Sequence, residues 1–179
     1  MIFGAEEQKK HIEERITALR TAASFINRVK TICNSFDGKV YNKRFDEAIQ
    51  ELSGDDGRLY VSNRYGWIYI TYYPRHGYNN EVTLLTGYSC VKTENNIRNQ
   101  DKEDFILFDD HKRINAAAMI EGLNRKYAEI LKEAYELEET FKNIDQILDQ
   151  VKKAKEILSA IVAPLPSIII DTYGIKRYY

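Results

Sequence analysis

Aromatic residues and arginines gather in one short part of the chain, residues 58–75. Residues 67–73 are rich in aromatic and β-branched side chains, which is typical of a β-strand. Because side chains alternate across a strand, we expect one aliphatic face that packs in the core and one aromatic face bordered by arginines. The candidate binding residues on and around the aromatic face are Trp67, Tyr69, Tyr73, Tyr60, Arg58, Arg64 and Arg75. The residues expected on the aliphatic face are Leu59, Val61, Ile68, Ile70 and Tyr72.

Three interpretations fit the aromatic face. Tyrosine, tryptophan and arginine dominate the energetic hot spots of protein interfaces, so the face is suited to contact with another protein. Exposed rings beside arginines also stack single-stranded bases, but the chain lacks the glycine–aromatic signature of RNA-recognition strands. The third interpretation needs no ligand, because tyrosines can cover the second face of a sheet and keep their hydroxyl groups in water.

A second candidate follows a short apolar run, residues 105–108. The sequence Asp110-His111-Lys112 matches the acid-x-Lys pattern found on the strands of metal-dependent nucleases. Such a site needs a second acid on a neighbouring strand to complete a metal pair, and Glu81 serves only if the strands pair suitably. The alternative is that Asp110 caps the helix that follows and that Lys112 lies in solvent.

No other residues form a recognisable catalytic, metal or cofactor site. The three histidines are not grouped with cysteines at zinc-binding spacing. Nucleophile-elbow, P-loop and dinucleotide-binding patterns do not occur. Cys33 falls on the apolar stripe of a helix, where we expect a buried free thiol. The sequence therefore predicts no metal and no cofactor, and it offers no argument for enzymatic activity.

Composition limits the partners and the compartment. The 26 basic and 27 acidic residues give a net charge of −1, which disfavours a general polyanion binder. No apolar run reaches the ~18 residues of a membrane span, and the first residues become charged too early for a signal peptide. We therefore expect a cytoplasmic protein without membrane association. Abundant tyrosine, isoleucine, asparagine and lysine, which have AT-rich codons, suggest a low-GC bacterial or phage genome.

The elements that position these residues follow from hydrophobic periodicity. The expected elements are a helix over residues 5–36, a helix over residues 42–53, a β-meander over residues 58–108, a long helix over residues 110–163 and a C-terminal tail over residues 164–179. We expect one α+β domain over residues 1–179. In it, long amphipathic helices form an antiparallel coiled-coil-like pair that flanks an antiparallel meander of three to five strands.

The last helix is too long to remain within a compact domain unsupported. At ~1.5 Å per residue, a continuous helix from Leu123 to Ala163 exceeds ~60 Å, whereas a domain of this length is ~35 Å across. The helix must therefore bend, break or find a partner. Antiparallel packing against the first helix is the expected solution. The alternatives are a break near residues 143–145 and pairing with the same helix of a second copy.

These observations lead to a functional hypothesis rather than to an activity. We expect a non-enzymatic protein-interaction module, of the kind that a phage or mobile element uses to bind and inhibit a host protein. Another protein is the expected partner, with a homodimer through the long helices as a further expectation. Single-stranded nucleic-acid binding through the aromatic face is one alternative. Metal-dependent nuclease activity around Asp110 and Lys112 is the other.

Overall fold

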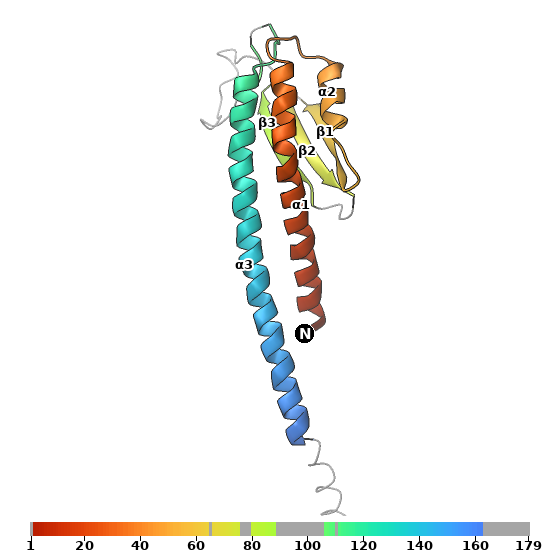
Figure 1. Cartoon of the computed structure of the whole chain (residues 1–179), viewed down its shortest axis with the longest axis vertical. Helices are drawn as coiled ribbons and strands as arrows, with labels where there is room; N and C mark the ends of the chain where they lie inside the picture. The colour runs from red at the N-terminus through yellow and green to blue at the C-terminus, as the bar shows by residue number, and fades with distance from the viewer. Residues whose placement is uncertain (1, 65, 76–79, 89–105, 110, 163–179) are drawn as a thin grey trace, which may run out of the picture.

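A small antiparallel sheet packs against two long helices (Figure 1). A computed structural model describes residues 2–64, 66–75, 80–88, 106–109 and 111–162. The elements are, in chain order, α1 (Ile2–Ser35), α2 (Lys43–Gln50), β1 (Gly57–Arg64), β2 (Trp67–Pro74), β3 (Val82–Tyr88) and α3 (Ala116–Val162). The predicted α+β class, the antiparallel sheet and the packing of the first helix against the last are confirmed. The predicted tail lies outside the described residues.

α1 and α3 run antiparallel and share one apolar seam (Figure 1). Leu19 and Val29 of α1 have no exposed surface and Ile26 retains 1%, while Leu123 and Ala134 of α3 are fully buried. Burial of a leucine, isoleucine or valine side chain contributes about 1.5–3 kcal/mol before conformational entropy is subtracted. The seam therefore supports the part of α3 that lies alongside α1.

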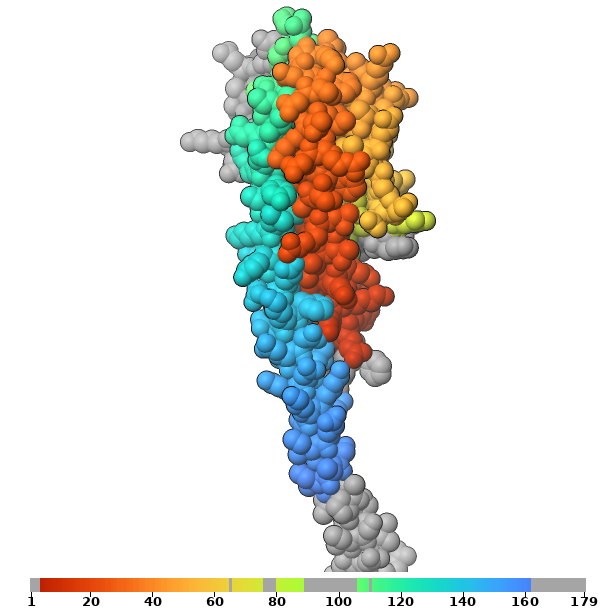
Figure 2. All heavy atoms as spheres, in the orientation of Figure 1, coloured from red at the N-terminus to blue at the C-terminus, as the bar shows by residue number. Residues whose placement is uncertain are grey.

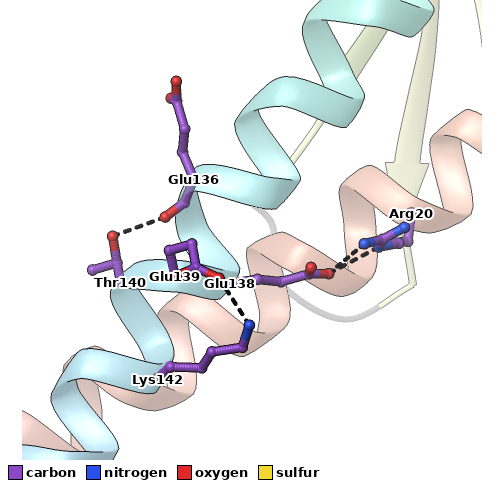
Figure 3. Close-up of polar contacts among 6 residues, drawn as sticks. All are labelled: Arg20, Glu136, Glu138, Glu139, Thr140 and Lys142. Atoms are coloured by element: carbon purple, nitrogen blue, oxygen red, sulfur yellow. Dashed lines mark hydrogen bonds and ion pairs between the residues drawn. The ribbon is translucent and has the colours of Figure 1, made fainter.

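Ion pairs link the two helices across this seam. Arg15 Nε lies 2.8 Å from Glu133 Oε1, and Arg20 Nη2 lies 2.6 Å from Glu138 Oε1 (Figure 3). Because these side chains are partly exposed, each pair contributes only about 0.2–1 kcal/mol. Their contribution to the stability of the seam is therefore small beside that of the buried apolar residues.

α3 is one continuous helix, so the alternative of a break near residues 143–145 does not occur. Lys9 of α1 pairs with Asp145, and α3 projects past the N-terminal end of α1 (Figures 1 and 2). Every residue from 149 to 161 is exposed. The large exposed apolar residues of this end are Ile147, Val151, Ile157, Leu158 and Ile161. None of the described helices has an apolar stretch long enough to cross a membrane.

The sheet has the strand order β1-β2-β3 and buries its inner face against the helices. The alternation expected from the sequence agrees with this burial, because Ile68 and Ile70 have no exposed surface and Tyr72 retains 1%. The register between β2 and β3 shifts next to Ile70, which leaves Leu84 without a partner across the pair. This bulge lets both Leu84 and Leu85 enter the core, where neither has exposed surface.

Two glycines shape the β1–β2 hairpin. Gly66 has a φ of 83° in the turn between the strands, a conformation that side chains other than glycine rarely adopt. Gly57 opens β1 directly against its neighbour strand. A Cβ atom at Gly57 would lie 2.5 Å from the carbonyl oxygen of Tyr73 and 2.7 Å from Cε2 of Tyr72. Position 57 therefore has no room for a side chain.

The segment before α3 differs from the prediction. α3 begins at Ala116, later than predicted, and Asn115 caps it by accepting the N–H of Ala118 on Oδ1 at 3.1 Å. Upstream, Asp109 Oδ1 accepts the backbone N–H of Arg113 at 2.8 Å and closes a turn. The carboxylate of Asp109 thus satisfies backbone donors of a turn, and the helix starts only after that turn.

Two other bounds also differ. The described residues of the apolar run that ends the predicted meander, 106–108, make isolated bridges only, from Ile106 to Tyr88 and from Phe108 to Ile114. The described sheet therefore has three strands, the lower end of the expected range. α2 ends at Gln50, short of the predicted residue 53.

Candidate functional site

Six of the seven candidate binding residues lie on the outer face of the sheet, whereas Arg75 follows the end of β2 and also borders a hollow against α1. Cross-strand pairing sets their positions, because Arg58 pairs with Tyr73 and Arg64 pairs with Trp67. Tyr60 lies in the same strand as the two arginines, two residues after Arg58. Each of these residues alternates with a residue of the inner face, so their side chains point away from the core.

A shallow trough of about 390 Å³ runs along this face. Its lining residues are Tyr60, Ser62, Arg64, Trp67, Tyr69, Thr71, Tyr73, Glu81 and Thr83. Tyr60 and Tyr73 are its most exposed rings, at 49% and 38%, whereas Thr71 retains 8% and lies at the base of the trough. The trough thus combines aromatic sides with a small hydroxyl-bearing residue at its base.

The rings of the outer face pack against one another. The centroids of Trp67 and Tyr88 lie 3.9 Å apart, and the rings of Trp67 and Tyr69 are stacked with centroids 6.3 Å apart. Tyr60 meets Tyr73 edge to face at a centroid distance of 6.5 Å. Rings that already support one another lose little conformational freedom when a partner covers them.

A second depression of about 390 Å³ adjoins the trough at Tyr73, which lines both. Its lining residues are Gly54, Asp55, Gly57, Arg58, Tyr73, Pro74 and Arg75. Arg58 and Arg75 are exposed. Across the described ranges, neither they nor Arg64 makes an ion pair or a side-chain hydrogen bond. All three candidate arginines therefore keep their guanidinium donors available to a ligand.

Glu81 adds a negative charge to the trough. Its backbone carbonyl accepts a hydrogen bond from Arg15 Nη1 at 2.9 Å, which ties the residue before β3 to α1. Its exposed side chain lines the trough, as that of Arg64 does. The trough therefore carries one charge of each sign.

The nuclease hypothesis finds no assembled site. Asp110 lies outside the described residues. Lys112 lies in a turn with a φ of 58°. Its backbone carbonyl accepts a hydrogen bond from the N–H of Tyr41, which lies beyond the C-terminal end of α1. The backbone carbonyl of Glu81 is bonded instead to Arg15, in the first half of α1, so Lys112 and Glu81 contact opposite ends of the segment that runs from Arg15 to Tyr41. Within the part of the chain that the structure describes, no three His, Cys, Asp or Glu residues are grouped to hold a metal.

The strongly perturbed titratable groups lie away from the trough. Burial raises the pKa of the Cys33 thiol to about 12, which keeps it protonated and unreactive. Burial also raises the pKa of Tyr41, whose hydroxyl donates a hydrogen bond to Asp46 Oδ1 at 2.7 Å. Neither Cys33 nor Tyr41 lines the trough, so neither supplies acid–base chemistry to it.

Sequence reasoning missed Tyr88 and the role of Glu81 in this site. Tyr88 lies across from Trp67 through the register between β2 and β3, which depends on the bulge at Leu84. The two successive leucines Leu84 and Leu85 interrupt the alternation of apolar and polar residues, and this is the local signal that could have indicated the bulge. The sequence suggested Glu81 only as a metal ligand. Its place in the trough follows from the strand pairing, which the sequence does not show.

No protein-family model matches the chain, and neither the curated proteins nor the solved structures include one with significant similarity to it. The geometry of the outer face is therefore the basis for interpreting function.

Proposed function

We propose that this protein is a non-enzymatic interaction module that binds a partner protein through the outer face of its sheet. The observation that carries the proposal is the trough, which the exposed rings of Tyr60 and Tyr73 line together with Arg64. The depression that Arg58 and Arg75 line adjoins it, and none of the three arginines has an ion-pair partner among the described residues. Tyrosine, tryptophan and arginine are the residues enriched in interface hot spots. The helices cover the inner face, which leaves the outer face for a partner.

Three features favour a protein over a nucleic acid as this partner. The rings of Trp67, Tyr69 and Tyr88 pack on one another, so the face offers few free ring surfaces for base stacking. Glu81 lies in the trough, where it repels a phosphate backbone. The net charge of −1 gives no general attraction for polyanions.

The expected strength of the contact follows from the exposed rings. An aromatic side chain buries 150–250 Å², and Tyr60 and Tyr73 are 49% and 38% exposed. A partner that covers both rings therefore removes roughly 60–120 Å² of surface per ring, or about 1.5–3 kcal/mol each. Loss of both rings is expected to weaken binding roughly 100-fold or more.

The test compares two pairs of exposed tyrosines. The partner is captured from nuclease-treated extract of the source cells and is then identified and purified. Its affinity for the chain is measured by calorimetry. Tyr60→Ala/Tyr73→Ala is expected to weaken binding roughly 100-fold or more. Tyr127→Ala/Tyr135→Ala removes two exposed tyrosines of α3, 40% and 63% exposed, and is expected to leave affinity unchanged. Equal affinity of both double variants for the partner would remove the proposal, and capture that depends on nucleic acid would favour the alternative.

A finer proposal concerns the biological setting. We infer that binding takes place in the cytoplasm and that a phage or mobile element uses the module to inhibit a host protein. Its support is compositional only, so the purified partner decides it. The activity of that partner is measured with and without the chain, and unchanged activity at saturating chain would reject inhibition.

A separate proposal concerns a homodimer through α3. Its support is the exposed apolar residues at the projecting end, of which Leu158 is 59% exposed. A dimer has twice the 20.9 kDa mass of one chain in light scattering. Leu158→Glu is expected to return the mass to that of one chain, while Lys153→Glu, an exposed position on the same helix, is expected to leave the dimer intact. A wild-type chain that stays monomeric up to its solubility limit would reject the dimer.

A further inference from the structure

The depression around Arg58 and Arg75 has a charge that the trough does not have. It contains two guanidinium groups and one carboxylate, that of Asp55. Arg58 and Arg75 are exposed and have no ion-pair partner in the described part of the chain. Many of the other basic side chains are paired, as Arg20 is with Glu138 at 2.6 Å (Figure 3). Neither arginine is therefore held in an ion pair among the described residues. Arg75 also borders a neighbouring hollow that Glu13, Glu14 and Asp56 line.

Tyr73 joins this depression to the trough. Tyr73 lines both hollows, and its backbone pairs with that of Arg58. A chain segment that lies in the trough and covers Tyr73 is thus led directly to the two guanidinium groups. Arginine presents a planar fork of donors that matches a carboxylate, and such charge-assisted hydrogen bonds are about twice as strong as neutral ones.

We infer that the segment of the partner protein that binds the outer face is acidic at one end. In this arrangement aromatic contact with Tyr60 and Tyr73 holds the segment in the trough, and one or two carboxylates of the segment pair with Arg58 and Arg75. The inference rests on the proposed function, since it specifies the chemistry of the segment that fills the same face.

The charges favour a peptide carboxylate over a nucleic-acid backbone. A nucleic acid carries a phosphate at every step, so it would bring negative charge to Glu81 in the trough and to Asp55 in the second depression. A peptide carries acidic side chains at chosen positions only. It can therefore present carboxylates to Arg58 and Arg75 and neutral residues to Glu81.

The experiment selects peptides from a random display library on the immobilised full-length chain. We expect the selected peptides to contain more aspartate and glutamate than the starting library. A synthetic copy of the strongest peptide is then titrated against the wild-type chain and its variants. Arg58→Ala/Arg75→Ala is expected to weaken its binding about 10- to 100-fold and to flatten the dependence on salt.

The matched control removes two exposed arginines away from the trough. Arg44→Ala/Arg113→Ala changes the net charge equally and is expected to leave the peptide affinity within about two-fold, since distant surface charges are screened by salt. An equal loss in both double variants would mean that net charge alone attracts the peptide, and it would overturn the inference. Selected peptides without acidic enrichment would overturn it as well, as would tighter binding of a single-stranded oligothymidine than of the peptide.

The same titration separates this inference from the proposed function. Tyr60→Ala/Tyr73→Ala tests whether the outer face binds the peptide at all. If that variant loses binding while Arg58→Ala/Arg75→Ala keeps it, the acidic segment is rejected and the interaction face stands. If neither variant loses binding, both are rejected.

Discussion

Replacing Gly57 by alanine should destabilise the protein by loosening the end of the sheet that carries Arg58 and Tyr73. A Cβ atom at this position would meet the Tyr73 carbonyl oxygen at 2.5 Å and both Cε2 and the hydroxyl oxygen of Tyr72 at 2.7 Å. The Tyr72 ring cannot simply move, because it is 1% exposed and its hydroxyl donates a hydrogen bond to the Asp56 carbonyl at 3.0 Å. Either the strands separate or the ring shifts and loses that bond.

The magnitude follows from these two costs. Forcing an extra carbon into a packed core costs about 1–3 kcal/mol, and a lost hydrogen bond adds about 0.5–1.5 kcal/mol. We therefore expect the free energy of unfolding to fall by about 2–4 kcal/mol. With a urea m-value of about 2 kcal/mol/M, the midpoint should drop by about 1–2 M.

Urea denaturation followed by circular dichroism measures this shift. Gly54→Ala is the control, because a Cβ atom there has no neighbour within 4 Å and Gly54 lies in the same turn as Gly57. Its midpoint should remain near that of the wild type or rise slightly, since alanine restricts the unfolded chain. A Gly57→Ala midpoint equal to that of Gly54→Ala would refute the close approach of β1 and β2 at this point.

Two further predictions use the perturbed titratable groups. In a Cys90→Ser variant, the Cys33 thiol, whose pKa burial raises to about 12, should react with a thiol reagent only as fast as the protein unfolds, and rapid reaction in native buffer would contradict its burial. Hydrogen bonds from backbone N–H groups, that of Arg113 first, lower the pKa of Asp109. Asp109 therefore contributes stability above its ordinary pKa of 3.8, and this contribution is lost as pH falls through its lower folded value. The melting temperatures of wild type and Asp109→Ala should converge in acid, and a constant difference from neutral pH to that range would contradict the role of this carboxylate.

The sequence predicted an element correctly where the spacing of its apolar residues alone determined the element. The stripe that includes Leu19 and Ile26 identified α1, and the alternation through Ile68 and Ile70 assigned the two faces of β2 correctly. The pairing of α1 with α3 followed from length alone, because a helix of that size needs support along its side.

The remainder depended on contacts between distant segments or on side-chain caps. The bulge at Leu84 exists because two successive leucines enter the core, and it sets which residue of β3 faces Trp67. The predicted start of α3 was wrong because Asp109 closes a turn and Asn115 caps the helix. The site was predictable as a set of rings and arginines, whereas its trough was not, since Glu81 joins it through strand pairing.

The central claim is that the outer face of the sheet contacts a partner protein, and site-specific photo-cross-linking in the source cells tests it most directly. A benzophenone amino acid replaces Tyr60, 49% exposed beside the trough, or Tyr135, 63% exposed on α3. We expect the probe at Tyr60 to form one dominant protein adduct that the probe at Tyr135 does not form. An adduct from Tyr135 alone, or from neither position while the chain still co-purifies with its partner, would contradict the assignment of this face.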